Sequence, residues 1–399
     1  MYEIMSADEA IRLIRDGDCI CVNSFVGIEN PTELHEALYR RYQKMQSPTH
    51  LTIVSSAGFG VWDDEHNAEG YIREGAVDKL ICGHFGAMMS TKKLVLEDRF
   101  EAYNLPLGCI SHAIRAQAGG LPGALSKVGL DIFVDPRREG PGINRISIDD
   151  SLVKHVEVDG DEFLYYKLPK ITIAMIKGTA ADRKGNITFD DMFMSGDALS
   201  ICQAVKANRG KVIVQVDRLV ATPSRPRNAI IPGCLVDAIV VAEPQERNEA
   251  YTALTGSFEI PYKEWHTWNE KINDLSQKQR KNNIPANIIG KRAAQELRVD
   301  DIVNIGIGIP ETVARFARKS GMLDMITLTV ESGGIGGFPV SGEAFGAMIG
   351  AASVYDMANQ FDLYDNGGLD VCFMGALEVD KYGNINAHRG TGAFAGIGG

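Results

Sequence analysis

The chain has 399 residues, of which 45% are hydrophobic and 23% are charged, and its formal net charge is −11. The length accommodates two domains of ordinary size, and the composition is typical of a soluble globular protein. The negative charge argues against nucleic-acid binding. No apolar run is long enough to span a bilayer, and the start of the chain does not resemble a signal peptide.

The seven cysteines are scattered and form no CxxC pair, and their odd number does not suit a complete disulfide framework. This usage is typical of a reducing cytoplasm, and it argues against a zinc site. The eight histidines also lack the spacing of metal ligands. We therefore expect a metal-free cytoplasmic protein.

The N-terminal part alternates between helical and strand-like segments. Residues 8–15 and 32–44 have the apolar periodicity of helices, and residues 19–22 between them read as a buried strand. This alternation predicts an α/β fold with a largely parallel sheet and helices on both faces. Further strands are predicted at 51–54, 80–82, 132–134, 171–176, 212–216 and 238–241.

Two segments depart from this alternation. Residues 153–168 are charged and alternating, with Asp159-Gly160 in the middle, which predicts a β-hairpin. Residues 247–283 are polar and aromatic and have no strand pattern, so we interpret them as a linker. The predicted organisation is an N-terminal domain at 1–246, the linker, and a C-terminal domain at 284–399.

The second domain begins like the first. A helix is predicted at 289–298, a strand at 302–304, a loop at 305–310 and another helix at 311–319. Val22-Asn23 matches Val303-Asn304 in this alignment, and the segment DRKGNIT at 182–188 matches DKYGNIN at 380–386. Both of the latter predict type I′ hairpins built on Gly-Asn. Repeated matches in one order predict a doubled α/β unit with a crevice between its halves.

The stretch at 325–346, MITLTVESGGIGGFPVSGEAFG, suggests where chemistry could take place. Residues 326–330 alternate like a strand, and Glu331 follows directly, before a run of glycines. Ligands of open α/β sheets bind beyond the carboxyl ends of strands, and small neighbours would let a bulky ligand reach the Glu331 carboxylate. The alternatives are a glutamate that caps the next helix and glycines that serve only to turn the chain.

Other motifs are less informative. The loop IGIGIP at 305–310 is not a GxGxxG motif and is not followed by the acidic residue that a dinucleotide site requires. His84 and His112 lie near glycines, and we expect them to be packed or hydrogen-bonded rather than catalytic. No GxSxG nucleophile motif and no phosphate-binding P-loop is present.

Taken together, the motifs closely resemble the family I coenzyme A transferases, which act on 3-oxoacids, acetate and propionate. The resemblance rests on VNIGIGIP at 303–310, ESGGIGG at 331–337 and GALEVDKYGN at 375–384. In the N-terminal half, AYNLPLGCI at 102–110, Ile114-Arg115 and VGLDIFVDPR at 128–137 are similar to the propionate and short-chain acyl branch. The resemblance to the family covers essentially the whole chain.

The resemblance implies that Glu331 is the nucleophile of a ping-pong exchange of CoA between an acyl-CoA and a short carboxylic acid. It implies oxyanion donors at Asn304 and Gly398, and no permanently bound cofactor or metal. It also implies a homo-oligomer. The expected CoA contacts are Gly306, Ile307, Gly308, Ile309, Pro310 and Gly396.

Two other functions stay open at this stage: an acyl-CoA hydrolase of the same fold and a non-catalytic CoA-binding subunit. Family members continue beyond the position of the final GIGG with further strands and helices, so the resemblance implies that the second domain is incomplete at Gly399. The identity of the acids is not predicted, because pocket residues on scattered loops cannot be placed from the sequence.

Overall fold

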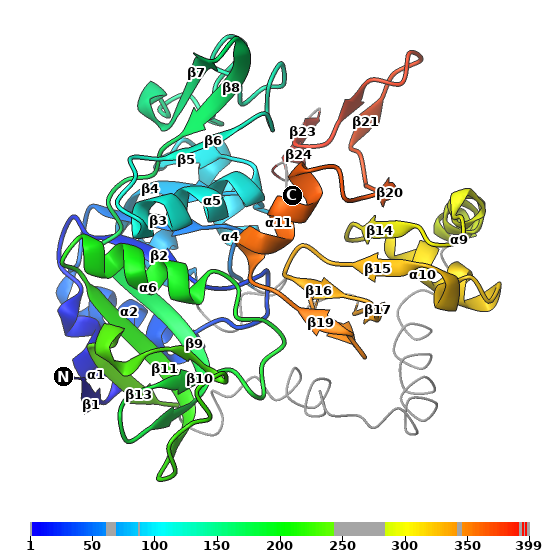
Figure 1. Cartoon of the computed structure of the whole chain (residues 1–399). Coiled ribbons are helices and arrows are strands. Elements are labelled where there is room, and N and C mark those ends of the chain that lie inside the picture. The colour runs from blue at the N-terminus through cyan, green and yellow to red at the C-terminus, as the bar shows by residue number, and fades with distance from the viewer. Residues whose placement is uncertain are drawn as a thin grey trace.

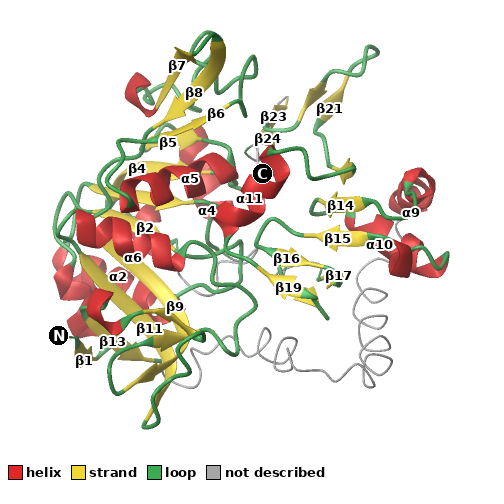
Figure 2. Cartoon of the chain, viewed as in Figure 1, coloured by secondary structure: helices red, strands yellow, loops and turns green. Residues whose placement is uncertain are grey.

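A computed structural model of the chain describes residues 2–60, 69–86, 88–242, 284–340, 345–390, 393–394 and 396. The linker predicted at 247–283 lies outside these residues, so its lack of strands stays a prediction. The described chain forms a large N-terminal sheet and a smaller C-terminal sheet, with helices α5 (Leu107–Ala118) and α11 (Met357–Asp365) packed together between them (Figures 1 and 2).

The N-terminal sheet has the strand order β1-β13-β11-β9-β2-β3-β4-β5, and every pair along this path is parallel. The short strand β10 pairs antiparallel with β9 and β12 at one end. The predicted parallel sheet is therefore confirmed. The strands are β1 Glu3–Met5, β2 Cys19–Val22, β3 Leu51–Ser55, β4 Val77–Cys82, β5 Glu101–Asn104, β9 Ile173–Asp182, β10 Ile187–Thr188, β11 Lys211–Val220, β12 Ala229–Ile231 and β13 Ala238–Val241.

Apolar side chains cover both faces of this sheet. Successive residues of one strand belong to different cores: Ile53 packs with one helical layer and Val54 with the other. This explains why the strands read as continuous apolar runs, since both faces are buried. The first layer holds α1 Ala7–Ala10, α2 Thr32–Met45, α3 Gly70–Arg73 and α4 Met89–Leu96, and the second holds α5 and α6 Ala198–Ala207.

A small antiparallel sheet lies at one edge of the N-terminal half, in the order β6 (Ala124–Ser126), β8 (Asp161–Tyr166), β7 (Val153–Val158). Its hairpin confirms the prediction at 153–168, because Asp159 and Gly160 both have positive φ, as a two-residue type I′ turn requires. The strand predicted at 132–134 is wrong. These residues form successive turns after Asp131, whose φ is +63°. The segment is apolar because Val134 is buried in the core, not because it pairs with another strand.

The C-terminal sheet has the order β19-β16-β15-β14-β20, in which β14 pairs parallel with β15 and β20, and β16 pairs antiparallel with β15 and β19. Helix α9 begins five residues before the predicted 289, because Ile284 and the buried Ala286 already belong to it. The elements are α9 Ile284–Ala293, β14 Ile302–Ile305, α10 Glu311–Lys319, β15 Thr327–Thr329, β16 Gly334–Ile335, β17 Phe338–Pro339, β18 Met348–Ile349, β19 Ser353–Val354, β20 Val371–Phe373, β21 Glu378–Val379, β22 Ile385–Asn386, β23 Arg389–Gly390 and β24 Ala393–Phe394. None of the described helices is long and apolar enough to cross a membrane.

The two halves are built alike, but not in the register that the letters suggest. Cys21 is the third residue of β2 and pairs with β3 and β9, and Asn304 is the third residue of β14 and pairs with β15 and β20. One step beyond each strand, the Asn23 N–H donates to Met175 O and the Gly306 N–H to Phe373 O. Asn23 therefore corresponds to Gly306, and its predicted match with Asn304 is wrong by two positions, because ladder hydrogen bonds set the register.

The second repeat is confirmed at its predicted positions. Asp182 accepts hydrogen bonds from the N–H groups of Lys184 and Asn186, and Asp380 accepts the same pair from Tyr382 and Asn384. The predicted type I′ geometry of these two turns is wrong. The closing hydrogen bond runs from Gly185 N–H to Asp182 O, and positive φ occurs in the described turns only at the glycines. Each is a type I turn followed by a left-handed glycine, which the aspartate side chain stabilises.

Candidate active site

Glu331 lies at the tip of a tight turn between β15 and β16. The Gly333 N–H donates to Val330 O, and the Val330 N–H donates to Gly334 O, so the chain reverses at Glu331 and Ser332. Gly333 has a φ of +117°, and a Cβ there would lie 2.0 Å from Tyr355 O. Only glycine fits this position. A strand rather than a helix follows, so Glu331 does not cap a helix.

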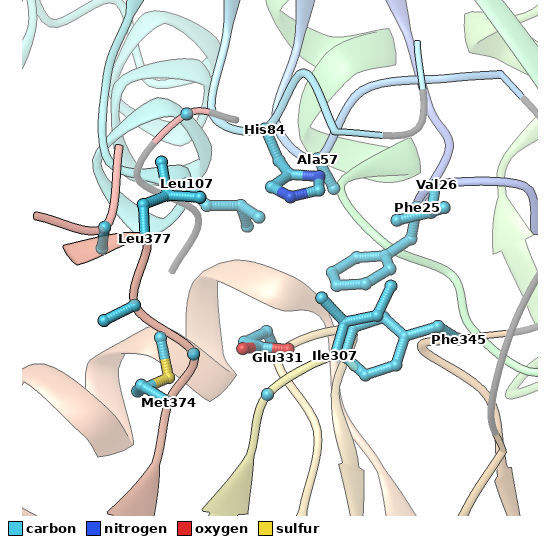
Figure 3. Close-up of a pocket in the computed structure, with 15 residues that line it drawn as sticks. Phe25, Val26, Ala57, His84, Leu107, Ile307, Glu331, Phe345, Met374 and Leu377 are labelled. Carbon is cyan, nitrogen blue, oxygen red and sulfur yellow. The ribbon is translucent and has the colours of Figure 1, made fainter. Parts of the chain in front are cut away.

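The Glu331 carboxylate lines a cavity of about 240 Å³ between the two halves of the chain. The N-terminal half contributes side chains from the loops beyond its parallel strands, and Figure 3 shows them facing Glu331 across the cavity. This is the crevice beyond strand ends where α/β proteins bind ligands. The lining residues are Phe25, Val26, Ala57, His84, Leu107, Gly306, Ile307, Glu331, Phe345, Met374, Gly375, Ala376, Leu377, Ala387 and Gly396.

Burial dominates the electrostatics of Glu331. The residue is 7% exposed, and its Oε2 atom has no hydrogen-bond partner among the described residues. Burial raises the pKa of the carboxyl group to about 7, while the backbone N–H of Glu331 and the Asn304 side chain lower it by hydrogen bonding to the charged form. The site therefore holds a carboxyl group that ionises near neutral pH and that has one oxygen without a partner in the described part of the chain.

A chain of hydrogen bonds orients Asn304. Its Nδ2 donates to the Tyr364 hydroxyl over 3.1 Å, and that hydroxyl donates to Thr329 Oγ1 over 2.8 Å. Thr329 Oγ1 in turn donates to Val303 O over 3.1 Å. The Asn304 amide is thus held from α11 and β15 while it contacts Glu331. Asn304 does not line the cavity, but its side chain contacts the Glu331 carboxyl group directly.

The structure brings together part of the predicted CoA loop. Gly306 and Ile307 line the cavity. Gly308, Ile309 and Pro310 do not, and the Gly308 N–H donates instead to Glu311 Oε1 over 2.7 Å. The predicted contact Gly396 also lines the cavity. Its φ is +93°, and a Cβ would lie 3.0 Å from Gly83 O, so any other residue would be strained at this close approach to the N-terminal half. Gly398 lies outside the described residues.

His84 was not among the predicted site residues, and the structure places it at the cavity. Its ring faces the cavity opposite Glu331 (Figure 3), and the expectation that it is packed or hydrogen-bonded rather than catalytic stays a prediction. Burial, followed by the charge of Lys92, lowers the pKa of His84 to about 4, so the ring is neutral at pH 7. The available signal was its position just after the strand β4. His112 fits the expectation: its Nε2 lies 3.1 Å from Ala358 O and 3.0 Å from Asp362 Oδ1 on α11.

The sequence also gave no sign of the apolar side of the cavity. Phe25 and Val26 come from the loop after β2, and Phe345 comes from a segment more than three hundred residues later. Val26 has a φ of +55°, which is rare for a β-branched residue and marks local strain. Apolar letters in loops have no periodicity that would have indicated a shared pocket.

Comparisons with known proteins give a consistent result. The model of the family described as coenzyme A transferase matches residues 4–242 and 286–392. The chain is 37% identical over 401 residues to acetate CoA-transferase YdiF of Escherichia coli K12, covering 99% of this chain and 73% of that protein. It is 35% identical to caffeate CoA-transferase of Acetobacterium woodii, covering 98% and 73%.

A solved structure agrees. The acyl-CoA transferase YdiF from E. coli O157:H7, described as a thioester complex with CoA, matches with a TM-score of 0.85 and 34% identity, over 100% of this chain and 77% of that one. The family match extends across both halves that enclose the cavity. The chain therefore belongs to the coenzyme A transferase family, and it is a CoA-transferase.

Proposed function

We propose that this chain transfers CoA from an acyl-CoA to a free carboxylate by a ping-pong route in which Glu331 is the nucleophile. The observation that supports this most directly is the buried Glu331 carboxyl group at the cavity between the halves, one of whose oxygens has no hydrogen-bond partner among the described residues. A carboxylate that ionises near neutral pH needs no general base. The relatives named for acetate and caffeate support simple monocarboxylic acids as substrates.

In the first half-reaction, a Glu331 oxygen attacks the thioester carbonyl and expels CoA thiolate, which forms an acyl-glutamyl anhydride. The thiolate then attacks the glutamyl carbonyl, releases the free acid, and leaves a glutamyl-CoA thioester. The second acid passes through the same steps in reverse. Atoms balance without any other reactant, because each step exchanges one acyl bond for another.

Asn304 would stabilise the charge that develops on the glutamyl oxygen, because its amide already donates a hydrogen bond to the carboxylate. One well-placed donor of this kind contributes about 3–4 kcal/mol to a transition state. Gly398 is the proposed second donor. Gly306, Gly396 and the loop through Ile307, Gly308, Ile309 and Pro310 are the proposed CoA contacts.

The apolar lining favours transfer over hydrolysis. The anhydride and the thioester both react with water, and a site walled by aromatic and aliphatic side chains limits its entry. The hydrolase is therefore the second candidate only, and a requirement for an acceptor acid separates the two. A homo-oligomer stays a prediction.

The test is to incubate the chain with acetyl-CoA or propionyl-CoA without an acceptor and to look for covalent CoA by mass spectrometry. Borohydride should reduce the thioester and leave the modification on the peptide that contains Glu331. Glu331→Gln should form no adduct and should still bind CoA, since an amide of equal size replaces the carboxylate. A catalytically active chain without an adduct, or full activity in Glu331→Gln, would contradict the mechanism.

A further inference from the structure

One side of the cavity is an aromatic wall formed by Phe25, Val26 and Phe345. The rings of Phe25 and Phe345 come from different halves of the chain, and their centroids lie 6.1 Å apart at an interplanar angle of 37°. These three residues are only 2–4% exposed. Figure 3 shows them grouped with Ile307 on one side of Glu331. The wall is therefore a closed, apolar surface next to the carboxylate.

The backbone holds this wall rigidly. Phe25 exchanges backbone hydrogen bonds with Ile28 in a tight turn, and Val26 within that turn has a φ of +55°. The Phe25 ring packs on the backbone of Gly346, where a Cβ would lie only 2.4 Å from Cδ1. A strained β-branched residue is retained only where surrounding contacts determine it, and such residues are common at ligand sites.

The opposite side of the cavity differs in exposure and in chemistry. Met374 and Leu377 are 47% and 42% exposed, so the cavity opens to solvent there. Between them lie Gly375 and Ala376, and no atom lies within 4 Å of the position of a Gly375 Cβ. The nucleotide of CoA is too large for the cavity and must extend into solvent. Accessible backbone also suits the amides of pantetheine, which need hydrogen-bond partners when buried.

The charges near the wall are unfavourable for a second anion. The described residues that line the cavity include no lysine or arginine. His84 is neutral at pH 7, and Glu331 is the acidic group of the site. A second carboxylate on the acyl group would be buried without a cationic partner and next to another carboxylate, which is a costly arrangement.

We propose that the aromatic wall is the acyl-binding surface, and that it selects acyl groups with an alkyl chain or an aromatic ring over acyl groups that carry a second carboxylate. CoA then enters from the side of Met374–Leu377. This inference rests on the proposed function and adds the class of substrate. It assigns Phe25 and Phe345 as specificity-determining residues.

The first experiment measures kcat/KM for acetyl-, propionyl-, hexanoyl-, cinnamoyl- and succinyl-CoA with one acceptor, butyrate, whose own thioester is not among the donors, so that every donor gives a net reaction. We expect succinyl-CoA to be at least about 10²-fold poorer than propionyl-CoA, because a charged group left unpaired is discriminated strongly. Succinyl-CoA turned over within a few-fold of propionyl-CoA would overturn the proposal. Absence of transfer from every donor would instead contradict the proposed function.

The second experiment compares Phe25→Ala and Phe345→Ala with Phe163→Ala, which truncates a half-buried phenylalanine on β8, away from the cavity. Shortening the wall should raise the ratio of hexanoyl- to acetyl-CoA kcat/KM by about tenfold, since pocket size discriminates by that order. Phe163→Ala should leave the ratio unchanged. An equal loss for all acyl-CoAs would show that the wall contacts pantetheine, and it would overturn the assignment. If an alanine variant does not fold, Phe25→Leu and Phe345→Leu give the same comparison.

Discussion

At the scale of single residues, the site depends on one carboxylate that is kept out of water. Glu331 lies at a strand end, where one of its oxygens has no partner among the described residues while Asn304 contacts the group. Burial makes the ionised form less stable and also removes the water that would weaken it as a nucleophile. The same burial affects both reactivity and stability, and each effect can be measured.

The rate of transfer should depend on the ionisation of Glu331. Its pKa of about 7 means that only part of the population is ionised at neutral pH, so kcat/KM should rise as pH increases through about 7 and then level off. His84 should not add a step in this range, because its pKa is about 4. A pH profile of kcat/KM that is flat between pH 5 and 8 would contradict this assignment.

Stability should show the opposite dependence. Because the pKa of Glu331 is higher in the folded state than its ordinary value of 4.5, ionisation destabilises the fold. The penalty is absent below pH 4.5, grows between 4.5 and about 7, and is complete above that. Glu331→Gln removes it, so the variant should exceed the wild type by about 3 kcal/mol at pH 8 and match it near pH 4. Denaturant unfolding at the two pH values measures this difference.

At the scale of elements, helix α11 connects the halves. One side of it carries Tyr364, whose hydroxyl accepts from Asn304 next to the nucleophile. Another side carries Asp362, which pairs with Arg115 and His112 on α5 at 3.0 Å each. The exposed Arg115 pair contributes little free energy. The helix nevertheless places the Tyr364 hydroxyl against Asn304 on β14 and Thr329 on β15.

Removing the Tyr364 hydroxyl should affect the site more than the fold. Tyr364→Phe takes away the acceptor that holds the Asn304 amide, so we expect kcat to fall about tenfold, the size of one lost hydrogen bond, with KM for acyl-CoA nearly unchanged. The apparent pKa in the pH profile should rise, because the Asn304 hydrogen bond lowers the pKa of Glu331. Tyr382→Phe, at a position 79% exposed, is the matched control. A lower melting temperature without a shift of the pH profile would mean a structural role only.

At the scale of the whole molecule, activity depends on how closely the halves approach, because the cavity has walls from both. The contact between α5 and α11 is tight at Gly108, where a Cβ would lie 2.5 Å from the Phe361 ring. Gly396 makes a second close contact at Gly83 O. Glycine at both positions allows the two layers to meet within reach of Glu331.

A methyl group at Gly108 should push the halves apart. Gly108→Ala should cost about 1–3 kcal/mol of stability through overpacking, and it should lower transfer activity because the cavity widens. Gly119→Ala at the end of the same helix is the control, since its Cβ would make only an ordinary contact of 3.5 Å. Thermal unfolding and transfer rates of both variants measure the effect. Equal behaviour of the two would show that the α5–α11 contact does not set the site.

Much of this architecture could be predicted from the sequence by itself. Local periodicity and turn chemistry identified most strands of the parallel sheet, the Asp159-Gly160 hairpin, the doubled unit with its paired turns at Asp182 and Asp380, and Glu331 at a strand end. These features depend on residues close together in the chain, so the local sequence pattern is enough to predict them. The motifs around Glu331 also indicated the family, which the comparisons confirm.

Only the tertiary structure decided the rest. Cys21 and Asn304 occupy equivalent positions in the two halves, which is set by ladder hydrogen bonds between strands distant in sequence. The similar residues Val22-Asn23 and Val303-Asn304 instead suggested that Asn23 was the equivalent of Asn304. His84, Phe25 and Phe345 meet Glu331 from loops that have no periodicity. Whether such a side chain is packed away or lines a cavity depends on how two halves of the molecule come together, and this is a contact between residues that the sequence keeps far apart.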